Sequence, residues 1–199
     1  MTSGKPGAVQ PTSPSEGTNM VDIKVGDDYA DVDFSLLSRH LNLLDFELAR
    51  IIAAIKESAD PDTDGLCDAG EYFIGHGFVA IQRYLTSTYA GLRIAQSVAF
   101  SVPPIVNSNL TFAEAINAGA NYWKHVEEWF ESLNKAENAT LKGNALNTLK
   151  KLEMATGWED YTCSNLLVIL VNEKELELSR LLPRVAEWRN NLMRKAIQL

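Results

Sequence analysis

The sequence lacks long hydrophobic runs, cysteine clusters and the short motifs that mark several large enzyme classes. Its longest clear apolar run, LLVILV at residues 166–171, is far shorter than the roughly 20 residues that span a bilayer, so we expect no membrane partner. The two cysteines, Cys67 and Cys163, have neither a zinc-site nor a redox spacing and suit a reducing cytoplasm, where we expect the protein. There is no glycine-rich phosphate loop, HExxH or GxSxG sequence, and nothing requires an organic cofactor.

The first 20 residues contain one lysine, no apolar block and many Gly, Pro, Ser and Thr residues. A secretory signal needs an apolar block, so none is predicted here. This composition buries too little apolar surface to offset the entropy of ordering, and we predict a disordered tail over residues 1–20. Residues 21–199 are long enough for a single domain with one core.

Charge is distributed unevenly along the chain, whose formal net charge is −8. Residues 1–75 contain 5 basic and 14 acidic residues, whereas residues 176–199 contain 5 basic and 2 acidic ones. An acidic first half argues against a broad nucleic-acid surface, so we expect no nucleic-acid partner. The basic C-terminal segment is expected to complement the acidic half of its own chain or of a neighbouring one. We therefore expect a protein partner or self-association.

Apolar residues recur at helical spacing through most of the chain. A first stripe predicts a helix over residues 34–58: Leu37, Leu41, Leu44, Leu48, Ile51 and Ile55. A second stripe predicts a long helix over residues 71–100, stopped by the prolines that follow: Ile74, Phe78, Ile81, Leu85, Tyr89, Leu92 and Ala95. A third predicted helix begins at the capping box Thr111-Phe-Ala-Glu114 and runs to about residue 133.

The remaining sequence gives shorter helical patterns. We predict a loop over residues 134–142, a helix over 143–155, and a buried helix or strand over 161–171, which periodicity does not distinguish. Pro183 should kink the last helix or mark a new start. That helix carries a stripe of Leu178, Leu181, Val185, Trp188 and Leu192. Strand signals are few, so we predict an all-α fold, a bundle of five or six helices.

The most informative motif is the acidic stretch DPDTDGLCDAGE at residues 60–71. Aspartates occupy alternate positions, a glycine follows, and a glutamate stands at the twelfth position. Calcium binds roughly six to eight oxygen ligands, and side chains from alternate residues let a chain wrap such an ion. Residues 60–72 resemble the calcium loop of EF-hand proteins, whose pattern is D-x-[DN]-x-[DN]-G-x5-E. The resemblance covers this stretch and its flanking helices alone.

The resemblance implies one Ca²⁺ ion and a defined set of ligands. These are the side chains of Asp60, Asp62, Asp64 and Asp68, the backbone carbonyl of Leu66 and both carboxylate oxygens of Glu71. Gly65 would take the sharp turn with a positive φ, which a side chain resists. The flanking apolar stripes contain no methionine, which calcium sensors use for adaptable binding surfaces, so we expect a structural ion in a protein-interaction module.

A second interpretation of the same stretch requires no ion. Aspartates favour turns and helix N-termini, where the helix dipole stabilises negative charge. Residues 60–71 would then be an acidic turn in a purely structural module. The glutamate at the twelfth position favours calcium, whereas the absence of a second, paired loop favours the plain turn, and both interpretations stay open.

A polar helix face offers an alternative function. Asn117, Asn121, Lys124, His125 and Glu128 recur at steps of three and four. With His76 and Arg83 from the preceding helix, such a face could support acid–base chemistry in a helical, metal-independent nuclease. The segment NYWKH weakly resembles the HEPN ribonucleases, but the arginine that precedes histidine in that class is missing, so no catalytic residue is assigned. The simpler interpretation is an exposed helix face with a Lys124–Glu128 ion pair.

Overall fold

The computed structural model describes residues 23–25, 28–107, 109–134, 141–157, 160–172 and 176–198. The chain divides into two units, Met1–Ala30 and Asp31–Leu199. In the first unit, β1 (Ile23–Val25) pairs antiparallel with β2 (Asp28–Ala30). The disordered tail predicted for residues 1–20 lies outside the described residues. The helical unit begins at Asp31, later than the boundary predicted after residue 20.

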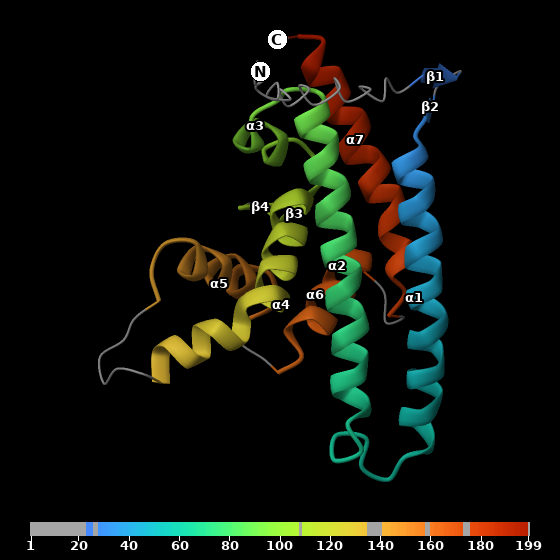
Figure 1. Cartoon of the computed structure of the whole chain (residues 1–199), viewed down its shortest axis with the longest axis vertical. Helices are drawn as coiled ribbons and strands as arrows, with labels where there is room; N and C mark the ends of the chain where they lie inside the picture. The colour runs from blue at the N-terminus through green and yellow to red at the C-terminus, as the bar shows by residue number, and fades with distance from the viewer. Residues whose placement is uncertain are drawn as a thin grey trace, which may run out of the picture. The chain divides into compact units, whose positions relative to one another are not determined.

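The second unit is helical, which confirms the all-α prediction. Its first two helices, α1 (Val32–Glu57) and α2 (Leu66–Gly91), run antiparallel and pack side by side (Figure 1). The Asp31 side chain caps α1 by accepting a hydrogen bond of 2.8 Å from the Phe34 N–H. Gly65 has a φ of 71° directly before α2, so the predicted glycine turn is present.

The long helix predicted over residues 71–100 is two helices in the structure. After α2 ends at Gly91, a turn in which Arg93 has a φ of 56° leads into α3 (Gln96–Phe100). Ile94 and Phe100 are both buried, so the apolar pattern continues across the break and gives no sign of it. Glycine is a poor helix former, which is consistent with α2 ending at Gly91. The extra helix brings the count in the described residues to seven α-helices.

A short hairpin precedes the helix that carries the predicted polar face. β3 (Ile105–Asn107) pairs antiparallel with β4 (Leu110–Thr111), and α4 (Phe112–Asn134) follows directly. The predicted capping box is present. The Glu114 N–H donates to the Thr111 hydroxyl oxygen at 3.2 Å, and the Thr111 N–H donates to the Glu114 carboxylate at 3.1 Å.

The C-terminal helices pack on α2 and α4. They are α5 (Gly143–Thr156), α6 (Thr162–Val171), the 3-10 helix η1 (Leu178–Leu181) and α7 (Leu182–Ala196). α6 resolves the helix-or-strand alternative for residues 161–171. Pro183 lies in the first turn of α7, where the missing N–H has no intrahelical partner to lose, so it marks a new start.

Two glycines let side chains of neighbouring elements pack directly against the backbone of α2. A Cβ on Gly75 would lie 2.3 Å from Cδ2 of Trp123 on α4, and one on Gly77 would lie 2.5 Å from Cδ1 of Leu178 on η1. Trp188 of α7 is fully buried, and its indole N–H donates to the Ala99 carbonyl at 2.9 Å. Helices from both halves of the unit therefore share one core.

Candidate functional site

Residues 60–65 form a tight turn between α1 and α2. The Asp64 N–H donates to the Asp60 carbonyl at 3.1 Å, and the Gly65 N–H donates to the Asp62 carbonyl at 2.9 Å. The Leu66 N–H donates to the Pro61 carbonyl, also at 2.9 Å. These bonds close the backbone within six residues, and α2 begins at Leu66, earlier than the predicted start of the exiting helix.

Each aspartate of the turn has a hydrogen-bond donor within the protein. The Thr63 N–H and hydroxyl donate to the Asp60 carboxylate at 3.1 and 2.8 Å, and these bonds lower the pKa of Asp60. The Ser58 hydroxyl donates to Asp64 at 2.6 Å. The Tyr161 hydroxyl donates to Asp62. Donors from Ser58 and Thr63 nearby and from the distant Tyr161 therefore stabilise the negative charges of the turn.

The side chain of Glu71, a residue of α2, contacts the start of another helix, α6. Its carboxylate accepts hydrogen bonds from the Cys163 N–H at 2.6 Å and from the Ser164 N–H at 2.9 Å, in the first turn of α6. The N–H groups of a helix N-terminus lack intrahelical partners and carry partial positive charge, which suits a carboxylate. Burial and the adjacent Glu71 carboxylate raise the pKa of the Cys163 thiol, so this thiol stays protonated.

The structure thus distributes the predicted calcium ligands over three places. Asp60, Asp62 and Asp64 lie on the turn, Leu66 and the exposed Asp68 lie in the first turn of α2, and Glu71 contacts α6. Within the described residues, no group of three or more Asp, Glu, His or Cys side chains is arranged to hold a metal ion. Calcium binding would require the turn to rearrange and the Glu71 side chain to release the N–H groups at the start of α6. Calcium binding therefore stays a prediction.

The residues of the nuclease hypothesis make separate contacts in the structure, and the hypothesis stays untested. His76 packs against Trp123, with ring centroids 5.8 Å apart, and Arg83 lines a cavity between α1 and α2. Asn121 accepts a hydrogen bond from Gln82, and His125 lies 3.2 Å from Glu128. Within the described residues no hydrogen bond or ion pair joins any two of these four residues. Lys124, predicted to pair with Glu128, donates to Gln82.

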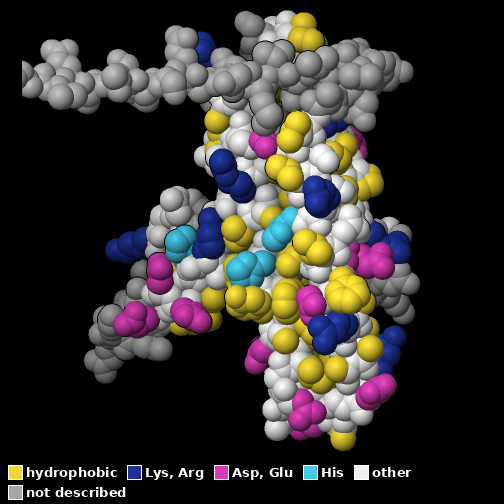
Figure 2. Space-filling model, turned by 45° about the vertical axis from the view of Figure 1, so that its right-hand side comes forward, with side chains coloured by type: hydrophobic (Ala, Val, Ile, Leu, Met, Phe, Trp, Pro, Cys, Tyr) yellow, Lys and Arg dark blue, Asp and Glu magenta, His cyan; other side chains and the backbone are white. Residues whose placement is uncertain are grey.

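The outer face of α1 is exposed and apolar. Val32, Leu36, Leu43 and Phe46 are each 54–68% exposed, and their spacing places them on one side of the helix. Figure 2 brings the side of the unit that carries α1 forward, and yellow hydrophobic side chains lie along it with basic, acidic and histidine side chains between them. The face stays largely exposed among the described residues, and Leu36 at its edge also lines the cavity between α1 and α2.

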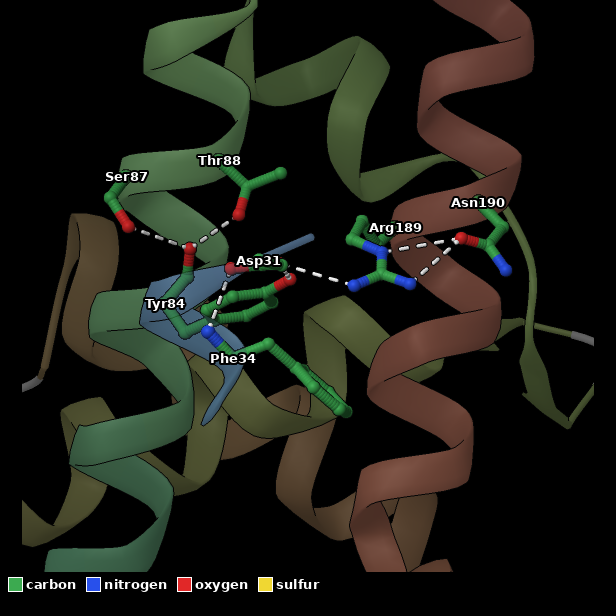
Figure 3. Close-up of polar contacts among 7 residues, drawn as sticks. All are labelled: Asp31, Phe34, Tyr84, Ser87, Thr88, Arg189 and Asn190. Carbon is green, nitrogen blue, oxygen red and sulfur yellow. Dashed lines mark hydrogen bonds and ion pairs between the residues drawn. The ribbon is translucent and has the colours of Figure 1, made fainter. Parts of the chain in front are cut away.

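A buried polar cluster joins the start of α1 to α2 and α7 (Figure 3). The Arg189 guanidinium lies 3.1 Å from the Asp31 carboxylate, and these side chains are only 2% and 7% exposed. The Tyr84 hydroxyl donates to the same carboxylate, and burial together with Asp31 raises the pKa of Tyr84. Arg189 also lies over the Phe34 ring, 5.2 Å from its centroid. Arg189, one of the five basic residues of the C-terminal segment, thus pairs with an acidic residue of its own chain.

Comparison with known proteins assigns no family, because no protein-family model, curated protein or solved structure matches the chain. In the part of the chain that the structure describes, no helix has the length and apolar character needed to cross a bilayer. Function has to be inferred from the chemistry of the surfaces and cavities that the fold presents.

Proposed function

We propose that this chain is a protein-interaction module that assembles with a second copy of itself through the exposed face of α1. The apolar stripe of Val32, Leu36, Leu43 and Phe46 supports the proposal. Large contiguous apolar patches are rare on monomeric proteins and mark interaction sites. Removing such surface from water stabilises a complex by roughly 25 cal/mol per Å², before the costs of association.

Charges beside the stripe favour a second copy over an unrelated partner. Arg39 and Glu47 lie one helical turn before and after Leu43, on the same side of α1. In an antiparallel pair of α1 helices with Leu43 on the two-fold axis, each Arg39 lies opposite the Glu47 of the other copy. Such a self-complementary contact is the usual arrangement in homodimers.

The same alignment pairs the other residues of the face. Phe46 lies opposite His40, which gives two aromatic rings in contact. Leu36 lies opposite Arg50, whose aliphatic stem can cover an apolar side chain while its exposed charged end pairs with Glu47 of its own helix at 3.0 Å. With 26 residues, α1 is about 39 Å long, enough to form the centre of an interface that buries about 800 Å² per copy.

Charge reversal tests both the surface and the alignment. Arg39→Glu places two glutamates opposite each other at each contact, and Glu47→Arg places two arginines there, so each variant alone should dimerise at least about ten-fold more weakly. In a mixed pair of the two variants both contacts join a glutamate to an arginine, whereas like copies repel, so an equimolar mixture should form a heterodimer. Sedimentation velocity over a range of concentrations measures all three samples. A parent protein that stays monomeric throughout would contradict the proposal.

Two phenylalanines provide a matched control. Phe46→Glu introduces charge into the proposed interface and should abolish dimerisation. Phe130 of α4 is similarly exposed, at 58% against 66% for Phe46, and lies outside the face. Phe130→Glu should therefore leave the dimer intact. Equal effects of the two variants would show that the apolar stripe of α1 is not the contact.

A further inference from the structure

A polar groove runs along α4, between α2 and α3 on one side and α5 on the other. Its volume is about 500 Å³, within the range of small-molecule sites. Two lysines, Lys124 and Lys151, contribute to its lining. The described lining contains no Asp or Glu, although acidic residues outnumber basic ones by 26 to 18 in the chain. Six amide side chains complete the polar surface: Gln82, Gln96, Asn117, Asn121, Asn144 and Asn147.

A chain of hydrogen bonds fixes the orientation of three of these amides. The Lys124 ammonium donates to Gln82 Oε1 at 2.8 Å. An ammonium can only donate, so the oxygen of Gln82 must face Lys124 and its nitrogen must face the other way. That nitrogen donates to Asn117 Oδ1 at 2.8 Å and to Asn121 Oδ1 at 3.0 Å. Because Gln82 occupies both asparagine oxygens, each asparagine retains its two N–H donors.

The groove therefore offers mainly hydrogen-bond donors. Asn117 and Asn121 each present two N–H donors, and Lys124 presents the N–H groups that it does not donate to Gln82. Asn144 and Asn147, on the opposite wall, have no hydrogen-bond partner within the described residues and can also donate. A ligand that matches this surface carries several acceptor oxygens.

The charge of the groove is positive and only partly balanced. Lys151 pairs with Glu114 at 2.9 Å, outside this part of the groove. Lys124 is exposed and has no carboxylate partner in the described residues, and its partial burial lowers its pKa. A bound anion would supply the missing negative charge.

A purely structural role explains only part of this arrangement. Gln82 links α2 to α4, and the hydrogen bonds among the amide side chains would be enough for such a link. It does not account for a groove lining that gathers two lysines and six amide side chains without a described acid. These features are what a binding site requires before its ligand arrives.

We infer that this groove binds the phosphoryl group of a small phosphorylated molecule, with Lys124, Asn117, Asn121 and Asn144 as the contacting residues. Planar carboxylates are matched best by the two-pronged guanidinium of arginine, and the described part of the lining contains no arginine. A tetrahedral phosphoryl group accepts hydrogen bonds from several directions and pairs well with the compact charge of lysine.

An adjoining cavity can accommodate the rest of such a molecule. It has a volume of about 600 Å³ and shares Gln96, Asn117 and Lys151 with the groove. Its lining is less polar and includes Phe100 and Ile105. A phosphate monoester with an organic part should therefore bind more tightly than free phosphate.

Calorimetric titration of the full chain tests the inference. The probes are inorganic phosphate, adenosine 5′-monophosphate and glucose 6-phosphate, with adenosine and glucose as uncharged controls. We expect at least one phosphorylated probe to bind and its uncharged counterpart to show no binding. Free phosphate binding as tightly as either ester would identify the free ion as the ligand and overturn the assignment to a monoester. Absence of binding by every phosphorylated probe at millimolar concentration would overturn the inference.

Substitutions separate binding from folding. Asn144→Asp breaks no described hydrogen bond, and it adds an acid to the first turn of α5, which favours the helix. It should keep or raise the melting temperature while weakening binding of the phosphorylated probe at least about ten-fold through like-charge repulsion. Lys124→Met should weaken binding by a similar factor. The controls Asn42→Asp and Lys56→Met, both on α1, should bind like the parent. Parent-like binding by Asn144→Asp and Lys124→Met together would overturn the inference.

Discussion

The carboxylate of Glu71 accepts hydrogen bonds from both the N–H and the hydroxyl of Ser164, at 2.9 and 2.8 Å. A side chain of α2 thus caps α6 from across the fold. Asp45 of α1 acts similarly, because the N–H groups of Leu178 and Ser179 at the start of η1 donate to it at 2.6 and 3.0 Å. Acidic residues of the first half of the chain therefore stabilise helix starts in the second half.

Replacing Glu71 by Gln should lower the free energy of unfolding by about 1 kcal/mol, the typical value of a helix cap. Glutamine keeps one acceptor oxygen but loses the charge that interacts with the α6 N-terminus. Urea denaturation measures the change. Glu127→Gln is the control, since Glu127 lies in the middle of α4, is exposed and has no hydrogen-bond partner within the described residues. A Glu71→Gln variant as stable as the parent would show that this cap contributes nothing.

The predicted calcium site can be tested separately from the cap. If residues 60–71 bind calcium, the ion should raise the melting temperature of chelator-treated protein by mass action. Asp62→Asn should abolish that increase, because Asp62 is a predicted ligand. Asp33→Asn, outside the stretch, should leave it unchanged. A parent protein whose melting temperature and titration heats do not respond to calcium contradicts the EF-hand interpretation.

Removing one partner of the Asp31–Arg189 pair should be strongly destabilising. Asp31→Ala leaves a buried guanidinium without its counter-charge and should cost about 3–5 kcal/mol. The double variant Asp31→Ala with Arg189→Met removes both charges and should be more stable than Asp31→Ala alone. Denaturant unfolding of the two variants checks the order. A double variant less stable than Asp31→Ala would show that the two charges do not stabilise each other.

The Glu114–Lys151 pair should make stability depend on pH in the acid range. Burial alone would raise the pKa of Glu114, but Lys151 and the Thr111 N–H outweigh it and lower the pKa below its ordinary value of 4.5. A carboxyl whose pKa is lower in the folded state stabilises the fold above the unfolded value, and this contribution is lost as pH falls through the folded pKa. Glu114→Gln should therefore flatten the stability curve below about pH 4.5. Identical curves for parent and variant would contradict this.

Two glycines of α2 should respond in opposite directions to alanine. Gly75→Ala places a Cβ into the Trp123 ring and should destabilise the protein by about 1–3 kcal/mol. At Gly70 a Cβ would meet only Ile51 Cγ2 at 3.9 Å, so Gly70→Ala should stabilise the helix by about 0.5–1 kcal/mol. Thermal denaturation of both variants tests the packing of α2 against α4.

The sequence predicts the helices well because helical periodicity and capping are local signals. Leu37, Leu41 and Leu48 are buried on α1 as their spacing predicts, and the Thr111–Glu114 capping box forms. The turn before α3 escapes prediction, because Arg93 adopts a left-handed conformation with no local signature. The turn returns Ile94 and Phe100 to the core, and helical periodicity does not predict a change of chain direction between them.

The polar sites were less predictable, since they depend on contacts between distant segments. The sequence correctly indicates that Asn117, Asn121 and Lys124 share one helix face. It gives no sign that Gln82 joins them, or that α5 forms the opposite wall. Asp31 and Arg189 are 158 positions apart, and no local pattern links them. The same limit applies to Glu71, whose contact with Ser164 depends on how α2 and α6 pack.

Asp31 is the first residue of the helical unit, and its position limits how far the chain can be shortened. A chain trimmed after Ala30 would carry a new ammonium group on Asp31 itself, close to the guanidinium that this residue neutralises. The extra positive charge would compete for the same carboxylate. Shortened versions for crystallisation or spectroscopy should therefore keep several residues ahead of this aspartate.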